Sequence, residues 1–247
     1  MRANLALRAA GLAVLGIGFG NAAEAGLVNV GVANAGFEEY VVGSPGGFIP
    51  VIADWTSAGA VGMFQPITPT SYSAPPPEGA QIGYIHENGS IFQVLGAQLV
   101  ADATYSLSVS IGERGDTDYL GNTISIGAYR VALMLEDALD PGNLAAATLL
   151  GEATSPMPAD GTFAVASVSY VAPGVLGALA GRNLIVALFG AVVPEPMVVN
   201  QLNFDDVRLT QFTDDDNNNG PAAVPEPATL ALYGLGLLGL AAMRRRR

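Results

Sequence analysis

The sequence predicts an all-β protein, a jelly-roll-like antiparallel β-sandwich, and three observations support this fold class. Residues 105–111 alternate strictly between aromatic or aliphatic and serine side chains, as a strand with one buried face does. The 31 glycines and 16 prolines interrupt the apolar stretches, which favours strands and turns. Few windows keep helical periodicity for three turns. Because many antiparallel strands bury their apolar faces in stacked sheets or a closed barrel, we expect two stacked sheets.

The expected strands follow one another through the middle of the chain. Residues 81–86 and 90–95 flank Glu87, Asn88 and Gly89, and Asn-Gly between two such runs predicts a β-hairpin. Four further strands are expected after residues 105–111, at 124–135, 162–170, 184–189 and 202–209.

The first 25 residues have the order of a secretory signal peptide. Two arginines precede an apolar stretch at residues 9–19, and the small-residue triplet Ala23-Glu24-Ala25 follows. This order predicts export, with cleavage after Ala25.

The C-terminal segment combines three features. Val224-Pro225-Glu226-Pro227 precedes an apolar run at residues 228–243, and Arg244, Arg245, Arg246 and Arg247 follow. A helix over this run would be about 24 Å long, just enough to span a bilayer with snorkelling arginines. The arginines would hold their end on the cytoplasmic side. A simple permanent anchor is one interpretation, but it leaves the rigid Pro-Glu-Pro unexplained.

All three features, in this order, resemble the PEP-CTERM sorting tag of exported bacterial proteins. The resemblance implies processing by an exosortase, transit through the inner membrane, and a final place at the cell surface or in the extracellular matrix, often with exopolysaccharide. The chain then divides into a signal peptide (1–25), an exported β-sandwich domain (26–213), a flexible linker rich in Asp and Asn (214–223) and the sorting tag (224–247).

Charge and cysteine content exclude several classes of function. Once both ends are set aside, four arginines remain against 20 acidic residues, so the exported domain would repel nucleic acid. The chain has no cysteine, which excludes disulfides, thiol catalysis and cysteine-ligated metals.

The two ends of the predicted domain carry a second resemblance. Asn34-Ala35-Gly36-Phe37-Glu38 near its start and Phe204-Asp205-Asp206-Val207 near its end resemble jelly-roll domains of the carbohydrate-binding-module, galactose-binding-like type. The resemblance implies that the first and last strands lie together. It also implies a structural Ca²⁺ held by Glu38 and Asp205 or Asp206, with an oxygen from around Asn34. The alternative is that these acidic side chains are solvated.

Residues for catalysis are few. His86 is the only histidine and precedes the predicted turn, so we expect a surface residue. We expect Arg114-Gly115-Asp116 to lie in a polar loop. Aromatic side chains suited to stacking on sugars are also present, and Trp55 is expected in the core. These candidates are Trp55, Tyr72, Tyr84, Tyr119 and Tyr129.

We therefore expect a non-catalytic exported surface or matrix protein, and no enzyme. Two alternatives stay open: a carbohydrate-binding module for exopolysaccharide, and a glycan-cleaving enzyme, which would need two carboxylates facing each other in a cleft.

Overall fold

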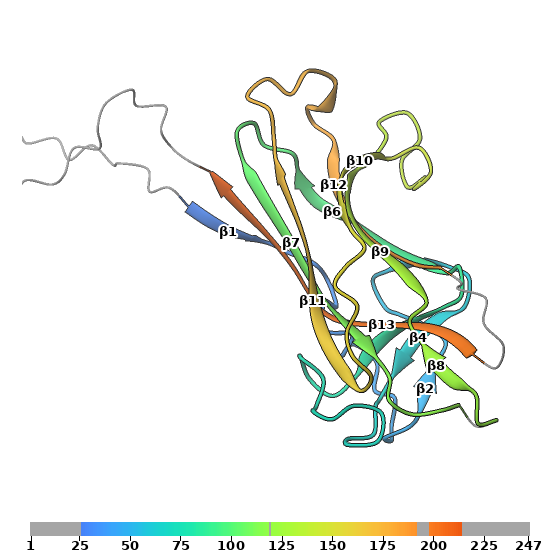
Figure 1. Ribbon diagram of the computed structural model, residues 1–247. Helices are drawn as coiled ribbons and strands as arrows, with labels where there is room; N and C mark the ends of the chain where they lie inside the picture. The colour runs from blue at the N-terminus through green and yellow to red at the C-terminus, as the bar shows by residue number, and fades with distance from the viewer. Residues whose placement is uncertain (1–25, 119, 192–197, 214–247) are drawn as a thin grey trace, which may run out of the picture.

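The computed structural model describes residues 26–118, 120–191 and 198–213, and they form an antiparallel β-sandwich. One sheet has eight strands in the order β11-β7-β13-β5-β4-β2, with β1 and β8 also paired to β13. The other sheet has five strands in the order β10-β9-β12-β6-β3. Figure 1 shows the two sheets and the crossing of β13 through the molecule. The predicted all-β sandwich is confirmed.

The strands differ greatly in length. The eight-stranded sheet contains β1 (Gly26–Val30), β2 (Phe48–Ile49), β4 (Val61–Phe64), β5 (Ile82–His86), β7 (Thr104–Glu113), β8 (Thr123–Ser125), β11 (Thr162–Val171) and β13 (Val198–Thr213). The five-stranded sheet contains β3 (Thr56–Ala58), β6 (Ser90–Gln98), β9 (Ala128–Leu135), β10 (Thr148–Ala153) and β12 (Asn183–Ala191). One short 3-10 helix, Gly177–Leu179, precedes β12.

Strand β13 organises the eight-stranded sheet along its whole length. Its last residues pair with β1, from Leu209 opposite Val30 to Thr213 opposite Gly26. Its first residues pair in parallel with β8. β1 and β8 therefore lie at opposite ends of β13, as Figure 1 shows. The expected neighbourhood of the first and last strands is confirmed.

The main core fills the space between the sheets. Its fully buried side chains include Phe37, Ile85, Leu133 and Phe204. Trp55 also lies in this core, as predicted, and its indole nitrogen donates a hydrogen bond to the Asn34 carbonyl. A second apolar cluster lies on the outer face of the eight-stranded sheet, formed by Phe64, Tyr72, Ile82, Tyr84 and Phe163. This outer cluster supports the candidate site.

The predicted hairpin at residues 81–95 is wrong, although both strands exist. β5 pairs with β4 and β13, whereas β6 pairs with β3 and β12 in the other sheet. A type I′ hairpin turn needs positive φ at both central residues, but here Glu87 has the positive φ. The Glu87 N–H donates to Asn200, and Gly89 accepts from Gly190, so the turn carries the chain between the sheets.

The expected strand at residues 124–135 is two strands. Gly127 has φ +68° and separates β8 from β9. The strands expected near residues 105–111, 162–170, 184–189 and 202–209 are confirmed as β7, β11, β12 and β13.

The signal peptide, the linker and the apolar run 228–243 lie outside the described residues, so their structures stay predictions. In the part of the chain that the structure describes, no helix is long and apolar enough to cross a membrane.

Candidate functional site

A cavity of about 490 Å³ lies on the outer face of the eight-stranded sheet. Along β5, Tyr84 and His86 face the cavity while Ile85 between them points into the main core. On β13, Gln201 is the register partner of His86 and also lines the cavity. The loops before β2, before β5 and after β7 complete the wall. The lining residues from these loops and from β2, β4 and β8 are Gly46, Phe48, Phe64, Ile67, Ser71, Arg114, Asp116, Thr117, Asp118 and Ile124, with Val199 from β13.

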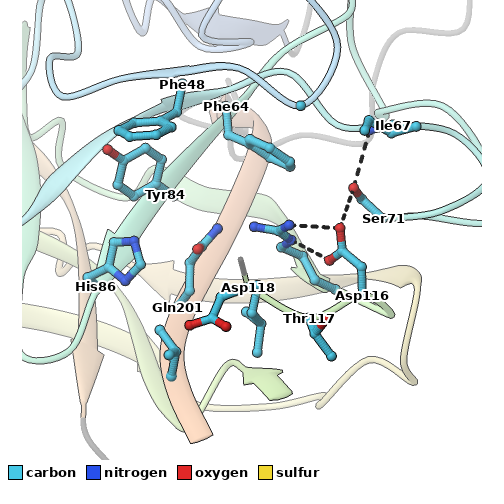
Figure 2. Close-up of a pocket in the computed structure, with 14 residues that line it drawn as sticks. Phe48, Phe64, Ile67, Ser71, Tyr84, His86, Asp116, Thr117, Asp118 and Gln201 are labelled. Atoms are coloured by element: carbon cyan, nitrogen blue, oxygen red, sulfur yellow. Dashed lines mark hydrogen bonds and ion pairs between the residues drawn. The ribbon is translucent and has the colours of Figure 1, made fainter. Parts of the chain in front are cut away.

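Aromatic rings form one side of the cavity. The Phe48 and Tyr84 rings meet edge to face with centroids 6.4 Å apart, and the Tyr84 and His86 rings do so at 5.1 Å. Figure 2 shows Tyr84 between Phe48 and His86. Gly62 lies under Tyr84, where a Cβ would overlap the Tyr84 hydroxyl and the Ile49 carbonyl oxygen. The glycine therefore allows the hydroxyl end of Tyr84 to lie close to the main chain of β4.

An ion pair forms the opposite side. Arg114 Nε donates to Asp116 Oδ1 at 2.7 Å, and Arg114 Nη2 donates to Oδ2 at 2.8 Å. The Ser71 hydroxyl also donates to Asp116 Oδ2 at 2.8 Å and accepts from the Ile67 N–H at 3.2 Å (Figure 2). The guanidinium carbon lies 4.4 Å from the centroid of Phe64, a cation–π distance. Three segments thus fix the guanidinium in one place.

The titratable groups of the cavity have perturbed pKa values with clear causes. Burial lowers the pKa of His86, so its imidazole is neutral at pH 7. Burial raises the pKa of Tyr84, so its hydroxyl stays protonated. Burial alone would raise the pKa of Asp116, but hydrogen bonds from Arg114 and Ser71 outweigh it and lower the pKa. Hydrogen bonds from Asn122, opposed by slight desolvation, lower the pKa of Asp118.

The cavity can therefore accept a proton at His86, donate one from Tyr84 and hold negative charge at Asp116 and Asp118. Such a combination in a mainly apolar pocket is typical of a site for general acid–base chemistry on a small molecule.

Residues 28–210 match the family model described as HpiC1 cyclase. The match covers most of the chain. The chain belongs to the HpiC1-like cyclase family.

Solved cyclases have the same fold as this HpiC1-like protein. An apo cyclase from Fischerella sp. is 21% identical over 75% of this chain and 96% of its own, with a TM-score of 0.63. The Stig cyclase Fisc from Fischerella sp. TAU, in complex with (3Z)-3-(1-methyl-2-pyrrolidinylidene)-3H-indole, is 21% identical over 76% of this chain and 100% of its own, with a TM-score of 0.62. A cyclase from Fischerella sp. TAU in complex with 4-(1H-indol-3-yl)butan-2-one is 22% identical over 76% and 99%, with a TM-score of 0.60.

Carbohydrate-binding modules are also among the solved structures that match, at TM-scores of 0.40 and 0.41, which are too low to support a conclusion about fold or ligand. No curated protein sequence matches the chain.

The family match corrects the expected function. We expected a non-catalytic surface or matrix protein and no enzyme, and the membership in a cyclase family contradicts both expectations. Hydrolytic motifs are absent from a cyclase sequence because a cyclisation needs no side-chain nucleophile and no metal ligand set with a recognisable spacing.

Residues 223–247 match the PEP-CTERM protein-sorting motif, so the predicted sorting tag is confirmed. The motif implies export, membrane association and exosortase processing of this HpiC1-like protein. The signal-peptide cleavage at Ala23 and Ala25 stays a prediction, as does contact with polysaccharide.

The predicted calcium ligands come from three segments that do lie together. The Val207 N–H donates to the Ala35 carbonyl, which joins β13 to the Asn34 loop. Glu38 Oε1 accepts from the Ala80 and Gln81 N–H groups at 2.6 and 2.7 Å. A Cβ at Gly79 would overlap the Glu38 carboxylate, and one at Gly36 would meet that of Glu78, so close packing brings the two segments together.

Asp205 and its neighbours have their own partners. Asp205 is fully buried, and its carboxylate accepts from the Glu78 and Asp206 N–H groups at 2.8 and 2.7 Å. Burial raises the pKa of Asp205 to about 8. Asp206 pairs with Arg208, and the Asn34 side chain binds the main chain of Glu39 and Ala53. Among the described residues, no group of three or more acidic or histidine side chains is placed to hold a metal. Bound calcium stays a prediction.

The other aromatic side chains that the sequence suggested for sugar binding lie in different environments. Tyr84 lines the cavity, whereas Tyr72 is buried beside it and stacks on Phe163 with centroids 4.3 Å apart. Tyr129 is buried and donates to the Pro156 carbonyl, and Tyr119 lies outside the described residues. We expected His86 at the surface, but in the structure it is half-buried and lines the cavity. The alternation of Tyr84 and His86 about Ile85 was the signal that could have placed both on one face.

Proposed function

We propose that this exported HpiC1-like protein catalyses the cyclisation of a small, uncharged or cationic aromatic molecule in the cavity that Phe48, Tyr84, His86 and Arg114 line. One observation carries the proposal. In a chain of a cyclase family, the cavity combines aromatic faces with a proton acceptor, a proton donor and two carboxylates.

The charges of the cavity favour a substrate without negative charge. The Arg114 guanidinium donates two hydrogen bonds to Asp116 and lies against the Phe64 ring, so its positive charge is already balanced by a carboxylate. Asp118 adds a further negative charge to the lining. An anion would meet two carboxylates and a neutralised arginine, and its binding would be unfavourable.

The proposed reaction is an isomerisation that needs no oxidant or reductant. A proton added to an unsaturated bond or a carbonyl of the substrate creates an electrophilic carbon. A π-bond of the same molecule then attacks this carbon, forming the new ring bond, and a proton leaves. The Tyr84 hydroxyl serves as donor and the neutral His86 as acceptor, and the proton taken up by His86 returns to Tyr84 through solvent before the next turnover. The rings of Phe48 and Tyr84 stabilise the developing positive charge.

The ligands of the solved cyclases support an indole as the aromatic part. Two of those proteins are in complex with indole compounds that carry a short substituent at one ring position. A cavity of about 490 Å³ is large enough for an indole with a side chain of a few carbons.

Incubation of the purified chain with a panel of indoles that carry unsaturated side chains tests the proposal. We expect a product of unchanged mass, a new retention time and a new carbon–carbon bond in its NMR spectrum. The double variant Tyr84→Phe, His86→Gln should lose this product, whereas Glu152→Gln, at an exposed ion pair on the five-stranded sheet, should keep it. An equal product yield from the double variant would refute the assignment of the cavity.

A further inference from the structure

A nearly uncharged segment surrounds the mouth of the cavity. From Tyr40 to Pro77 the chain has one charged residue, Asp54, although 13% of the whole sequence is charged. Gly46, Phe48, Phe64, Ile67 and Ser71 of this segment line the cavity. The rest of the exported domain is strongly acidic, and Asp116 and Asp118 line another part of the cavity, so the uncharged part of the cavity wall is the part that Phe48, Phe64 and Ile67 form.

Large apolar side chains of this segment are exposed. The exposed side chains are Tyr40, Val41, Phe48, Val51 and Ile67, which we call the apolar rim, and Phe48 and Ile67 among them line the cavity. Val41 is 83% exposed and Phe48 is 66% exposed. Soluble proteins rarely expose several large apolar residues in one region unless the region binds something.

Hydrogen bonds hold the main chain of the rim in place, so its apolar side chains are fixed in an exposed position. The Gln81 side chain binds the Tyr40 carbonyl at 2.8 Å and the Val42 N–H at 2.5 Å. The Gly46 N–H donates to the Gln65 carbonyl at 2.7 Å, and the Gln65 N–H donates to Gly47 at 3.0 Å. The Ile67 side chain packs on Gly46, where a Cβ would lie 3.0 Å from Ile67 Cδ1.

We propose that the apolar rim docks on the surface of a lipid bilayer and that the cavity takes apolar substrate directly from the lipid. The docking is inferred from the exposed side chains of the rim. Only the transfer of substrate from the lipid to the cavity rests on the proposed function. The occupant is a bilayer because the PEP-CTERM motif at residues 223–247 associates the chain with a membrane. A neutral rim with apolar side chains suits the interface, where burial of each side chain stabilises the docked state.

The length of the segment before the apolar run permits this docking. β13 has 16 residues and spans about 50 Å, with β8 and the cavity at its start and the chain exit at Thr213 at its end. Residues 214–227 could reach at most about 50 Å when fully extended. If β13 is perpendicular to the membrane, residues 214–227 can therefore place the rim on the bilayer that holds residues 228–243, whereas the four residues left after deletion of 214–223 cannot.

The chain has no cysteine, so a single introduced cysteine is the only site at which a thiol-reactive fluorophore can label it. The full chain with Val41→Cys carries an environment-sensitive fluorophore and is reconstituted in phosphatidylcholine vesicles. The matched control is Leu139→Cys, which is 97% exposed in the loop after β9. We expect nitroxide-labelled lipid to quench the label at position 41 and iodide to quench it at position 139.

Two further variants separate docking from other causes of protection. In the Val41→Cys background, Val51→Ser should lower the ratio of lipid quenching to iodide quenching by up to about tenfold, since one valine leaves the interface. Val175→Ser, also at an exposed valine outside the rim, should leave the ratio unchanged. Deletion of residues 214–223 should abolish lipid quenching at position 41 although the tail stays in the vesicle.

Three outcomes would overturn the proposal. Equal iodide quenching at positions 41 and 139 would mean that the rim is free in water. Protection from iodide without lipid quenching would mean that a second copy or the apolar tail covers the rim. Unchanged lipid quenching after the deletion would contradict the reach argument. Binding of an indole probe by the same sample is measured separately, so failure of docking and failure of the proposed function are distinguishable.

Discussion

Arg114 and Asp116 form a two-point ion pair across the cavity wall, with nitrogen to oxygen distances of 2.7 and 2.8 Å, while the guanidinium lies against Phe64. The two side chains are 12% and 15% exposed, so water screens them only weakly. The pair neutralises an arginine that would otherwise attract anions, and it fixes an aromatic ring at the same time.

Asp116→Asn should destabilise the protein by about 2–3 kcal/mol, because it leaves the Arg114 charge without its partner. The pKa of Asp116 is lowered, so its contribution to stability is present above the ordinary carboxyl range and disappears as pH falls through the lowered pKa. Chemical denaturation of both proteins at several pH values measures this difference. Glu152→Gln, at an exposed pair with Arg130, should change stability by less than about 1 kcal/mol. Equal effects of the two substitutions would contradict the account.

His86 should control the pH dependence of the proposed reaction. Burial lowers its pKa below the ordinary value of 6.5, so the imidazole is neutral at pH 7 and becomes protonated in more acidic solution. The rate should therefore fall as pH decreases through the lowered pKa of His86, which lies on the acidic side of the ordinary value. His86→Gln should lower the rate by a factor of about 10²–10⁴ and remove this limb of the profile. A profile that keeps the acidic limb in the variant would rule out His86 as the base.

Gly62→Ala should disrupt the cavity wall. A Cβ at this position would overlap the Ile49 carbonyl oxygen and the Tyr84 hydroxyl, so either β2 or the Tyr84 ring must move. We expect weaker ligand binding and a loss of stability of about 1–3 kcal/mol. Gly96→Ala on β6 is the matched control, because nothing lies within 4 Å of the position of its Cβ and its φ is not in the positive range that favours glycine. A binding constant that is the same in both variants would refute the contact.

Asp205 should make stability depend on pH in the opposite sense to Asp116. Its pKa is raised to about 8, so its favourable contribution is complete below the ordinary carboxyl pKa and disappears as pH rises through about 8. The stability difference between the wild type and Asp205→Asn should therefore shrink between pH 4 and pH 8 in chelator. A pH-independent difference would show that Asp205 has an ordinary pKa.

The predicted Ca²⁺ would bind the ionised carboxylate of Asp205, so its effect on stability also depends on pH. Added Ca²⁺ should raise the melting temperature at pH 8 more than at pH 5 in the wild type, and should have no effect on Glu38→Gln, Asp205→Asn. An unchanged melting temperature in the wild type would remove the predicted ion.

The sequence predicted the sandwich well and the site poorly, for physical reasons. Strict alternation in β7 and the apolar runs of β12 and β13 reflect burial that is local to each strand. Pairing is not local: Asn88-Gly89 resembles a hairpin turn, yet the bonds of Glu87 and Gly89 to β12 and β13 residues send the chain to the other sheet. The cavity depends on such pairing, since register places Gln201 beside His86.

The positions of Arg114 and Asp116, which lie in a loop, could not be predicted for the same reason. As a tripeptide with Gly115 they resemble any polar turn. Only contact with Ser71 and Phe64, more than 40 residues away, makes them part of a cavity. The sorting tag, in contrast, was predictable in full because its three features are contiguous in the chain.

Calorimetric titration with 4-(1H-indol-3-yl)butan-2-one tests the central claim most directly, namely that the cavity between Tyr84 and Arg114 binds the aromatic substrate of a cyclase. Thr117 lines this cavity and is exposed, so Thr117→Trp fills it without disturbing the core. Ser169→Trp, on the exposed side of β11, is the control. The account predicts binding to the wild type and to Ser169→Trp, and none to Thr117→Trp. Equal binding to all three proteins, or to none of them, would contradict it.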